Sequence, residues 1–275
     1  MTTPATLEGI YDMAEEEYHA HPALSVTAAK KLLPPSCPRL FRHDQDNKAP
    51  HKRTFDFGHA AHMVVLGAGP ELHVVGADNY LTKAAKTERD EAYARGAVPL
   101  LPAEFDTVQA MASALREHPR AADLFTDEGL AEQSLFWTDP ATGVPCRART
   151  DWLSRNVVDY KTTTDVSPPA ISRTVEKFFY HSQAAWYLDG AIHLDLIAED
   201  AEFLFVFQDK NPPYLVTVVD LHEEDLQIGR ERNRLAREIY RDCTEANIWP
   251  AYSNDIVRIS LPAYARRRHH EGIFA

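Results

Sequence analysis

Alternating apolar and polar positions in the middle of the chain predict β-strands. The runs there are short, rich in aromatic and β-branched residues, and divided by turn residues such as those of Asp139–Gly143. Strands that follow one another through tight turns pair with their neighbours, so the first three runs predict an antiparallel meander. The predicted strands cover residues 132–137, 144–153, 156–162, 202–208 and 214–221.

Helical spacing of apolar residues predicts helices before, between and after these strands. Ser25 is a candidate N-cap for a short helix that ends at Pro34-Pro35, and Pro102 begins a longer helix whose apolar residues repeat every three to four positions. The predicted helices cover residues 27–33, about 55–66, 82–95, 102–118, 182–191 and 223–243.

This order of elements predicts one mixed α/β domain. Helices, a meander, a helix, two strands and a long helix fit a central mixed sheet flanked by helices, and 275 residues suffice for a large hydrophobic core. We expect a single domain over residues 1–275. Within it we distinguish a basic N-terminal arm and helix (1–53), a helical part (54–130), a core sheet with its helices (131–255) and a C-terminal tail (256–275).

Composition narrows the functional classes. Lys and Arg number 29 against 41 Asp and Glu, a net charge of −12, which argues against a generally basic surface and leaves only local basic clusters, at 30–53 and 266–270. Three cysteines far apart, with no Cys-x-x-Cys pair, exclude a disulfide framework and a thiolate metal site. Without a long apolar run or a signal-peptide pattern, we expect no membrane association and a cytoplasmic protein.

The candidate chemistry lies in the meander. Asp159 and Lys161 alternate along one strand and therefore share a face. In the preceding strand Arg149 and Asp151 share a face by the same parity, and a turn centred near Arg155 would set Asp151 opposite Asp159. Two carboxylates and a lysine are thus expected on one surface.

Two carboxylates at cross-strand distance repel each other unless a cation lies between them. Oxygen ligands without a thiolate favour Mg²⁺ or Mn²⁺. Such a metal would bind a phosphodiester and lower the pKa of a bound water, while Lys161 orients that water or stabilises charge at phosphorus, which indicates phosphodiester hydrolysis. Asp-x-Lys by itself is more often an ion pair on a solvated strand than a catalytic motif, and that interpretation stays open at this point.

Four motifs in order resemble the PD-(D/E)xK nuclease superfamily and, more narrowly, RecE-type exonucleases (exodeoxyribonuclease VIII-like). The similarity extends over residues 10–255. Thr150 stands where the superfamily has proline before its first acid, and Asp159 stands where it often has glutamate. The matching motifs are Gly58-x-x-x-His62, Asp151, Asp159-Tyr-Lys161 and Tyr180-His-x-Gln183-x-x-x-Tyr187.

The resemblance implies a restriction-endonuclease-like core and assigns roles to residues. Asp151, Asp159 and His62 are the implied metal ligands, with His59 the competing histidine in the same turn. Glu132 resembles an acid that approaches a second metal or the glutamine helix, or it is a charged strand end. Arg149 would contact the scissile phosphate or clamp Asp151. The implied catalytic residues are Asp151, Asp159, Lys161 and Gln183, and the implied substrate contacts are Glu132, Arg149 and Tyr187.

The function implied by the resemblance is a Mg²⁺-dependent exonuclease acting on linear double-stranded DNA. It would digest in the 5′ to 3′ direction and leave 3′ single-stranded tails for homologous recombination, with Mn²⁺ able to replace Mg²⁺. The resemblance further implies a homo-oligomeric ring, a RecT-like single-strand annealing partner, and a phage or prophage origin. Three alternatives stay open: an endonuclease or repair nuclease of the same superfamily, a nuclease fold that binds DNA without turnover, and a metal-dependent structural protein of unrelated fold.

Overall fold

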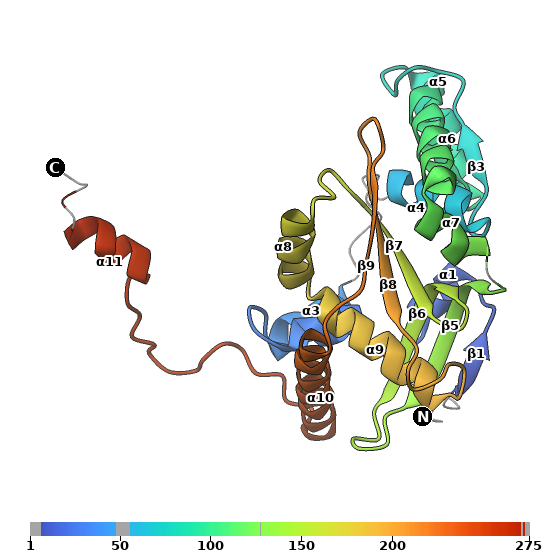
Figure 1. Cartoon of the computed structure of the whole chain (residues 1–275). Helices are drawn as coiled ribbons and strands as arrows, with labels where there is room; N and C mark the ends of the chain where they lie inside the picture. Colours follow the sequence, from blue (N-terminus) through green and yellow to red (C-terminus); the bar gives the residue numbers. More distant parts are fainter. Residues whose placement is uncertain (1–6, 48–55, 127, 271, 273–275) are drawn as a thin grey trace.

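A mixed β-sheet runs through the centre of the molecule. The computed structural model describes residues 7–47, 56–126, 128–270 and 272 (Figure 1). Neighbouring strands follow the order β1-β5-β6-β7-β8-β9, and β2 joins at β6. The strands of this sheet are β1 (Gly9–Tyr11), β2 (Leu24–Ser25), β5 (Leu130–Thr138), β6 (Pro145–Leu153), β7 (Val157–Thr163), β8 (Phe203–Asp209) and β9 (Val216–Val219).

The predicted meander is confirmed. Strands β5, β6 and β7 pair antiparallel, and β8 then lies parallel to β7. A parallel neighbour needs a crossover connection, and two helices form it, α8 (Pro168–Phe178) and α9 (Tyr180–His193). The predicted fold class, a mixed α/β core with helices on a central mixed sheet, is therefore correct. Strands β1 and β2, two or three residues long, were not predicted because so short a segment has no measurable periodicity.

The sheet is forked between β6 and β7. Only Trp152 with Val158 and Leu153 with Val157 pair across this junction, next to the turn. Farther along, β2 pairs with β6 at Cys146 and Arg147. Because β5 occupies the other edge of β6 along its whole length, β2 lies on the side that β7 has left. Side chains near the fork can therefore be reached from both faces of the sheet.

Alternation along β7 and β8 separates two hydrophobic cores. Val157 and Phe205 pack with α9 and with the long helix α10 (Glu223–Ala246) on one face. Val158 and Tyr160 pack on the other face with α4 (Asp56–Leu66). The period of two residues that places Val157 in the first core directs Asp159 and Lys161 to that same face.

The predicted helices are present with small shifts of their ends. Ser25 Oγ accepts the N–H of Ala28 at 3.3 Å, as expected of an N-cap, and Gly67 follows α4 with a left-handed φ of +67°. Phe55, the expected start of α4, lies outside the described residues. The other helices are α1 (Glu15–Ala20), α2 (Val26–Ala29), the 3₁₀ turn η1 (Lys30–Leu32), α3 (Pro38–Asp46), α5 (Lys83–Ala94), α6 (Pro102–Glu117), α7 (Pro119–Thr126) and α11 (Ala263–His270).

Two regions differ from the expected organisation. Residues 7–47 pack into the body, because β1 and β2 join the sheet and Leu24 and Phe41 are buried in its core. Of the expected basic arm, Lys48, Lys52 and Arg53 lie outside the described residues. A small parallel sheet of β3 (Leu72–Val74) and β4 (Val98–Leu100) interrupts the helical region and was not predicted.

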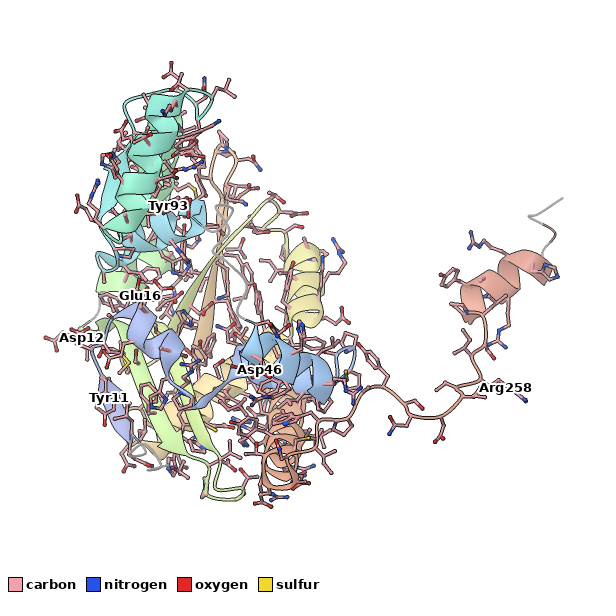
Figure 2. All side chains as sticks on the ribbon, turned by 180° about the vertical axis from the view of Figure 1, so that it is seen from behind. Tyr11, Asp12, Glu16, Asp46, Tyr93 and Arg258 are labelled. Carbon is pink, nitrogen blue, oxygen red and sulfur yellow. The ribbon has the colours of Figure 1, made fainter. Side chains whose placement is uncertain are left out.

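The C-terminal tail leaves the body as an extended segment. It runs from the end of α10 out to α11, and Arg258 lies well away from the sheet (Figure 2). The side chains of Ile256 and Ile259 are exposed. The basic residues 266–270 lie on α11 at the end of this segment. Within the described part of the chain, no helix has both the length and the apolar character that crossing a membrane requires.

Candidate metal and catalytic site

Three side chains from three elements gather at the fork in the sheet. His62 of α4, Glu132 of β5 and Asp151 of β6 each offer one ligand atom, and these atoms lie within 4.8 Å of one another. His62 Nδ1 is 3.4 Å from Asp151 Oδ2. The set supplies one imidazole nitrogen, a borderline ligand, and the hard carboxylate oxygens that suit Mg²⁺ or Mn²⁺.

Glu132 enters the cluster through an unusual backbone conformation. The β5–β6 register pairs Ala131 with Trp152 and Gln133 with Thr150, so Glu132 lies opposite Asp151. Its φ of +55° is left-handed, which is uncommon for a residue with a side chain and costs about 1 kcal/mol or more. A strand normally avoids this cost, so the conformation that aims Glu132 at Asp151 is held by its surroundings.

Arg149 holds the Glu132 carboxylate in place. Its Nε donates to Glu132 Oε2 at 2.7 Å, and its Nη1 donates to Ser134 Oγ at 2.8 Å and to the carbonyl of Met13 at 3.0 Å. The sequence offered a contact to the scissile phosphate or a clamp on Asp151 for Arg149. The structure shows instead a clamp on Glu132. This pairing fixes the side chain that the strained backbone presents.

Asp151 is fixed by β7. The N–H of Tyr160 donates to Asp151 Oδ2 at 2.7 Å, beyond the point where the strand pairing ends. The expected facing of Asp151 and Asp159 follows from the register, since Trp152 pairs with Val158. Burial, and next the charge of Asp159, raise the pKa of Asp151 well above its usual value. A bound cation would relieve both effects.

Asp159 lies beside the cluster with partners of its own. Its side chain is 2 % exposed, Gln183 Nε2 donates to its Oδ1 at 2.6 Å, and Lys161 forms an ion pair with its Oδ2. Burial alone would lower the pKa of Lys161, but the carboxylates of Asp159 and Asp151 outweigh that effect and raise it. Lys161 therefore stays protonated, and in this conformation Asp159 binds the lysine while Glu132 completes the ligand cluster.

His62 reaches the site from the opposite face of the sheet. Its ring lies edge-on to Tyr160, with centroids 5.1 Å apart, and Tyr160 belongs to the core under α4. Burial, and next the charge of Lys161, lower the pKa of His62, which keeps its imidazole neutral and able to bind a metal. His59, the competing histidine, is not in the cluster.

The remaining motif residues line the α9 side. Gln183 and Tyr187 lie one turn apart on α9, where Tyr187 is half-buried with its ring edge-on to Phe203, centroids 6.0 Å apart. The ring centroid of Tyr180 is 5.2 Å from Lys161 Nζ. For Glu132 the resemblance left open an approach to a second metal, an approach to the glutamine helix, or a charged strand end. The structure places it with His62 and Asp151, and its position opposite Asp151 in the predicted hairpin was a signal for that placement.

Comparisons with known proteins agree with this geometry. Residues 25–260 match the family described as a PDDEXK-like domain of unknown function. Since the match covers most of the chain, this protein belongs to that PDDEXK-like family, and the expected superfamily is confirmed. No curated protein matches it in sequence.

A solved structure has the same fold. The chain is similar to a crystal structure of a "putative exonuclease" from Eubacterium rectale, with a TM-score of 0.63 and 11 % sequence identity. The similarity covers 93 % of this chain and 98 % of that one. At so low an identity the likeness concerns the fold, which is shared over nearly the whole of both chains.

Proposed function

We propose that this protein is a metal-dependent deoxyribonuclease that hydrolyses phosphodiester bonds. The observation that carries the proposal is the arrangement at the fork. There the cluster of His62, Glu132 and Asp151 lies next to Lys161, which is paired with Asp159, and Asp159 in turn accepts a hydrogen bond from Gln183. A carboxylate-containing metal site beside a positioned cation can supply what phosphodiester hydrolysis needs, an activated water and stabilised charge at phosphorus. Membership of the PDDEXK-like family supports the same function.

His62, Glu132 and Asp151 would hold the metal, with Asp159 next to them. Bound there, Mg²⁺ or Mn²⁺ would polarise the phosphodiester and lower the pKa of a water molecule. The donor set fits such an ion. The raised pKa of Asp151 means that its charged form is disfavoured at this place, and a bound cation would favour it.

Lys161 and its partners supply the rest of the chemistry. A water oxygen attacks phosphorus and gives up one proton to solvent, the bond from phosphorus to the leaving oxygen breaks, and the leaving oxygen takes a proton from solvent. Lys161 Nζ, a protonated group with three donors, orients the attacking oxygen and stabilises the charge that develops on the phosphoryl oxygens. Gln183 fixes Asp159, and Asp159 fixes the lysine, so this geometry exists before substrate arrives.

Within this function we propose the RecE-type activity that the motifs resemble. The enzyme would use Mg²⁺, act on the ends of linear duplex DNA, degrade the 5′-ended strand and leave a 3′ tail for recombination. A closed ring of identical subunits and a RecT-like annealing partner belong to the same proposal, which rests on the resemblance of the motifs.

The decisive experiment compares substrates and metals. Linear duplex DNA labelled at its 5′ or 3′ end, and closed circular DNA, are incubated with the protein in Mg²⁺, in Mn²⁺ or in chelator. We expect metal-dependent loss of linear DNA that begins with the 5′ label, and intact circles. Cleavage of circles would instead identify an endonuclease, and DNA binding without hydrolysis in any metal would identify a binding module.

Two variants show whether the fork performs the reaction. Asp151→Asn removes a ligand, and we expect no hydrolysis. Asp165→Asn changes an acid of the same type beyond the end of β7, where its carboxylate accepts the N–H of Ser167 at 2.9 Å, and we expect unchanged hydrolysis. Equal activity of the two variants would exclude the fork as the active site.

A further inference from the structure

A second group of charged side chains lies behind the catalytic lysine. Lys30 at the start of η1, His181 on α9 and Arg232 on α10 surround the short link between α8 and α9. Nothing in the proposed reaction uses them. Their positions come from three separate parts of the chain, so the group exists only in the folded protein.

The fold places Arg232 there through one close helix contact. A Cβ at Gly229 would lie 2.3 Å from the carbonyl oxygen of His181, so only glycine allows α10 to approach α9 this closely. One turn later the guanidinium of Arg232 lies 4.2 Å from the centroid of the Phe179 ring. The N–H of Arg232 Nη2 donates to the carbonyl of Pro34 at a long 3.4 Å. Arg232 Nε is buried and has no acceptor among the described residues.

Lys30 connects this group to the active site. Its Nζ donates to the carbonyl of Phe178 at 2.9 Å and lies 5.7 Å from the centroid of the Tyr180 ring. Lys161 Nζ lies 5.2 Å from the same centroid. Both ammonium groups therefore lie by the same aromatic ring, and they are close enough for the charge of Lys161 to act on Lys30.

The cations of this group lack acidic partners. Within the described ranges neither Lys30 nor Arg232 forms an ion pair with a carboxylate, although Asp159 attracts Lys30 and Asp225 attracts His181 at longer range. Burial, and next repulsion from Lys161, lower the pKa of Lys30 to about 7. Like charges that are half-buried without counterions lower the stability of the folded protein. A bound anion would offset their repulsion.

We propose that Lys30, His181 and Arg232 form an anion subsite that binds a phosphate group of the nucleic acid strand held at the fork. Lys30 supplies a point charge, and Arg232 supplies the charge and N–H groups of its guanidinium. Burial lowers the pKa of His181, which as a neutral imidazole supplies one N–H. The proposal rests on the proposed nuclease function and adds to it a second contact with the substrate. The phosphate is either an internal phosphodiester or a terminal phosphomonoester, which share this chemistry.

A matched pair of double variants tests the subsite. Lys30→Gln with Arg232→Gln removes two charges from it, and Lys31→Gln with Arg234→Gln removes two charges from the same elements, where the ion pairs with Asp44 and Glu238 are on the surface. Binding of a fluorescent duplex with nuclease-resistant phosphorothioate linkages is measured in Mn²⁺ over a range of salt concentrations.

We expect the subsite variant to bind the duplex about tenfold or more weakly, with a log–log salt slope smaller by about 2. The control variant should stay within about twofold of the native protein. Equal loss with 5′-phosphate and 5′-hydroxyl duplexes assigns an internal phosphate, and loss with the 5′-phosphate duplex alone assigns the terminal one. Unchanged binding by a folded subsite variant would overturn the subsite and leave the nuclease function standing.

Two further measurements distinguish a direct phosphate contact from a purely structural role of these residues. Lys30→Arg with Arg232→Lys keeps both charges and should restore most of the affinity, whereas a purely structural role would not be rescued. In the native protein, amine acylation followed by mass spectrometry should show that the duplex protects Lys30 and leaves Lys31 reactive, and equal reactivity with and without duplex would refute the contact. A native protein that binds no duplex at all would overturn the proposed function together with the subsite.

Discussion

The backbone N–H of Tyr160 donates a 2.7 Å hydrogen bond to the carboxylate of Asp151, across the gap where β6 and β7 separate. The carboxylate of Asp151 here accepts the N–H that a backbone carbonyl of β6 would accept if the two strands stayed paired. The orientation of Asp151 is therefore set by the sheet itself, before any metal or substrate binds. Four predictions follow for the residues around this fork and for the helix contact behind it.

Asp151→Asn should abolish metal binding and stabilise the metal-free protein. Asparagine keeps an acceptor for the Tyr160 N–H and has no charge to bury. Folding raises the pKa of Asp151 above its unfolded value of about 3.9. The protonated carboxyl therefore adds to the free energy of unfolding below pH ~3.9, and that contribution is lost as the pH rises through the pKa of the folded protein. In chelator the variant should unfold a few degrees above the native protein near neutral pH, and the difference should shrink toward pH ~4. A variant less stable than the native protein near neutral pH would contradict this account.

Lys161→Met should remove catalysis and leave metal binding. The methionine keeps a side chain of similar length and deletes the ammonium group, which contacts Asp159 and lies 5.2 Å from the centroid of the Tyr180 ring. We expect the hydrolysis rate to fall by about 10²- to 10³-fold, as for the loss of other transition-state donors, while calorimetry still detects Mn²⁺. Hydrolysis at the native rate with an intact fold would exclude Lys161 from the mechanism.

Gln183→Glu and Gln183→Leu should destabilise the protein with different pH dependence. Leucine leaves Asp159 Oδ1 without its donor, at a cost of about 1–3 kcal/mol. Glutamate places a second buried carboxyl group beside Asp159, so at neutral pH it should lower the free energy of unfolding more than leucine does. This destabilisation should become smaller as the pH is lowered and one of the two carboxyl groups is protonated. Urea unfolding near pH 8 and pH 5 measures both effects, and identical pH dependence of the two variants would contradict the contact.

Gly229→Ala and Gly58→Ala separate a packing glycine from a motif glycine. The new Cβ at Gly229 would meet the His181 carbonyl, so α10 must move away from α9. We expect the free energy of unfolding to fall by about 1–3 kcal/mol. A Cβ at Gly58 meets nothing within 4 Å, and alanine in α4 should stabilise the helix by up to about 1 kcal/mol. Thermal unfolding tests both. Lost hydrolysis in a stable Gly58→Ala variant would show that substrate needs the space above this glycine.

Local sequence patterns determined much of the fold. The meander, the helices α4, α9 and α10 and the Ser25 cap follow from periodicity, turn residues and capping, which act over a few residues. The shared face of Asp159 and Lys161 follows from strand alternation, and the facing of Asp151 and Asp159 follows from a short turn. Strands β1 to β4 have too few residues to carry a period, so their pairing depends on partners far away in the chain.

Only the tertiary structure decided which side chains meet at the fork. The sequence placed His62 and Gln183 on helices, but the separation of β6 from β7 lets them reach the acids from opposite faces of the sheet. Glu132 joins the ligand cluster through a left-handed backbone conformation that its pattern of neighbours does not reveal. Lys30 and Arg232, some 200 positions apart in the sequence, come together because Gly229 lets two helices touch. These relationships depend on packing between segments far apart in the chain, and local sequence propensity does not predict such packing.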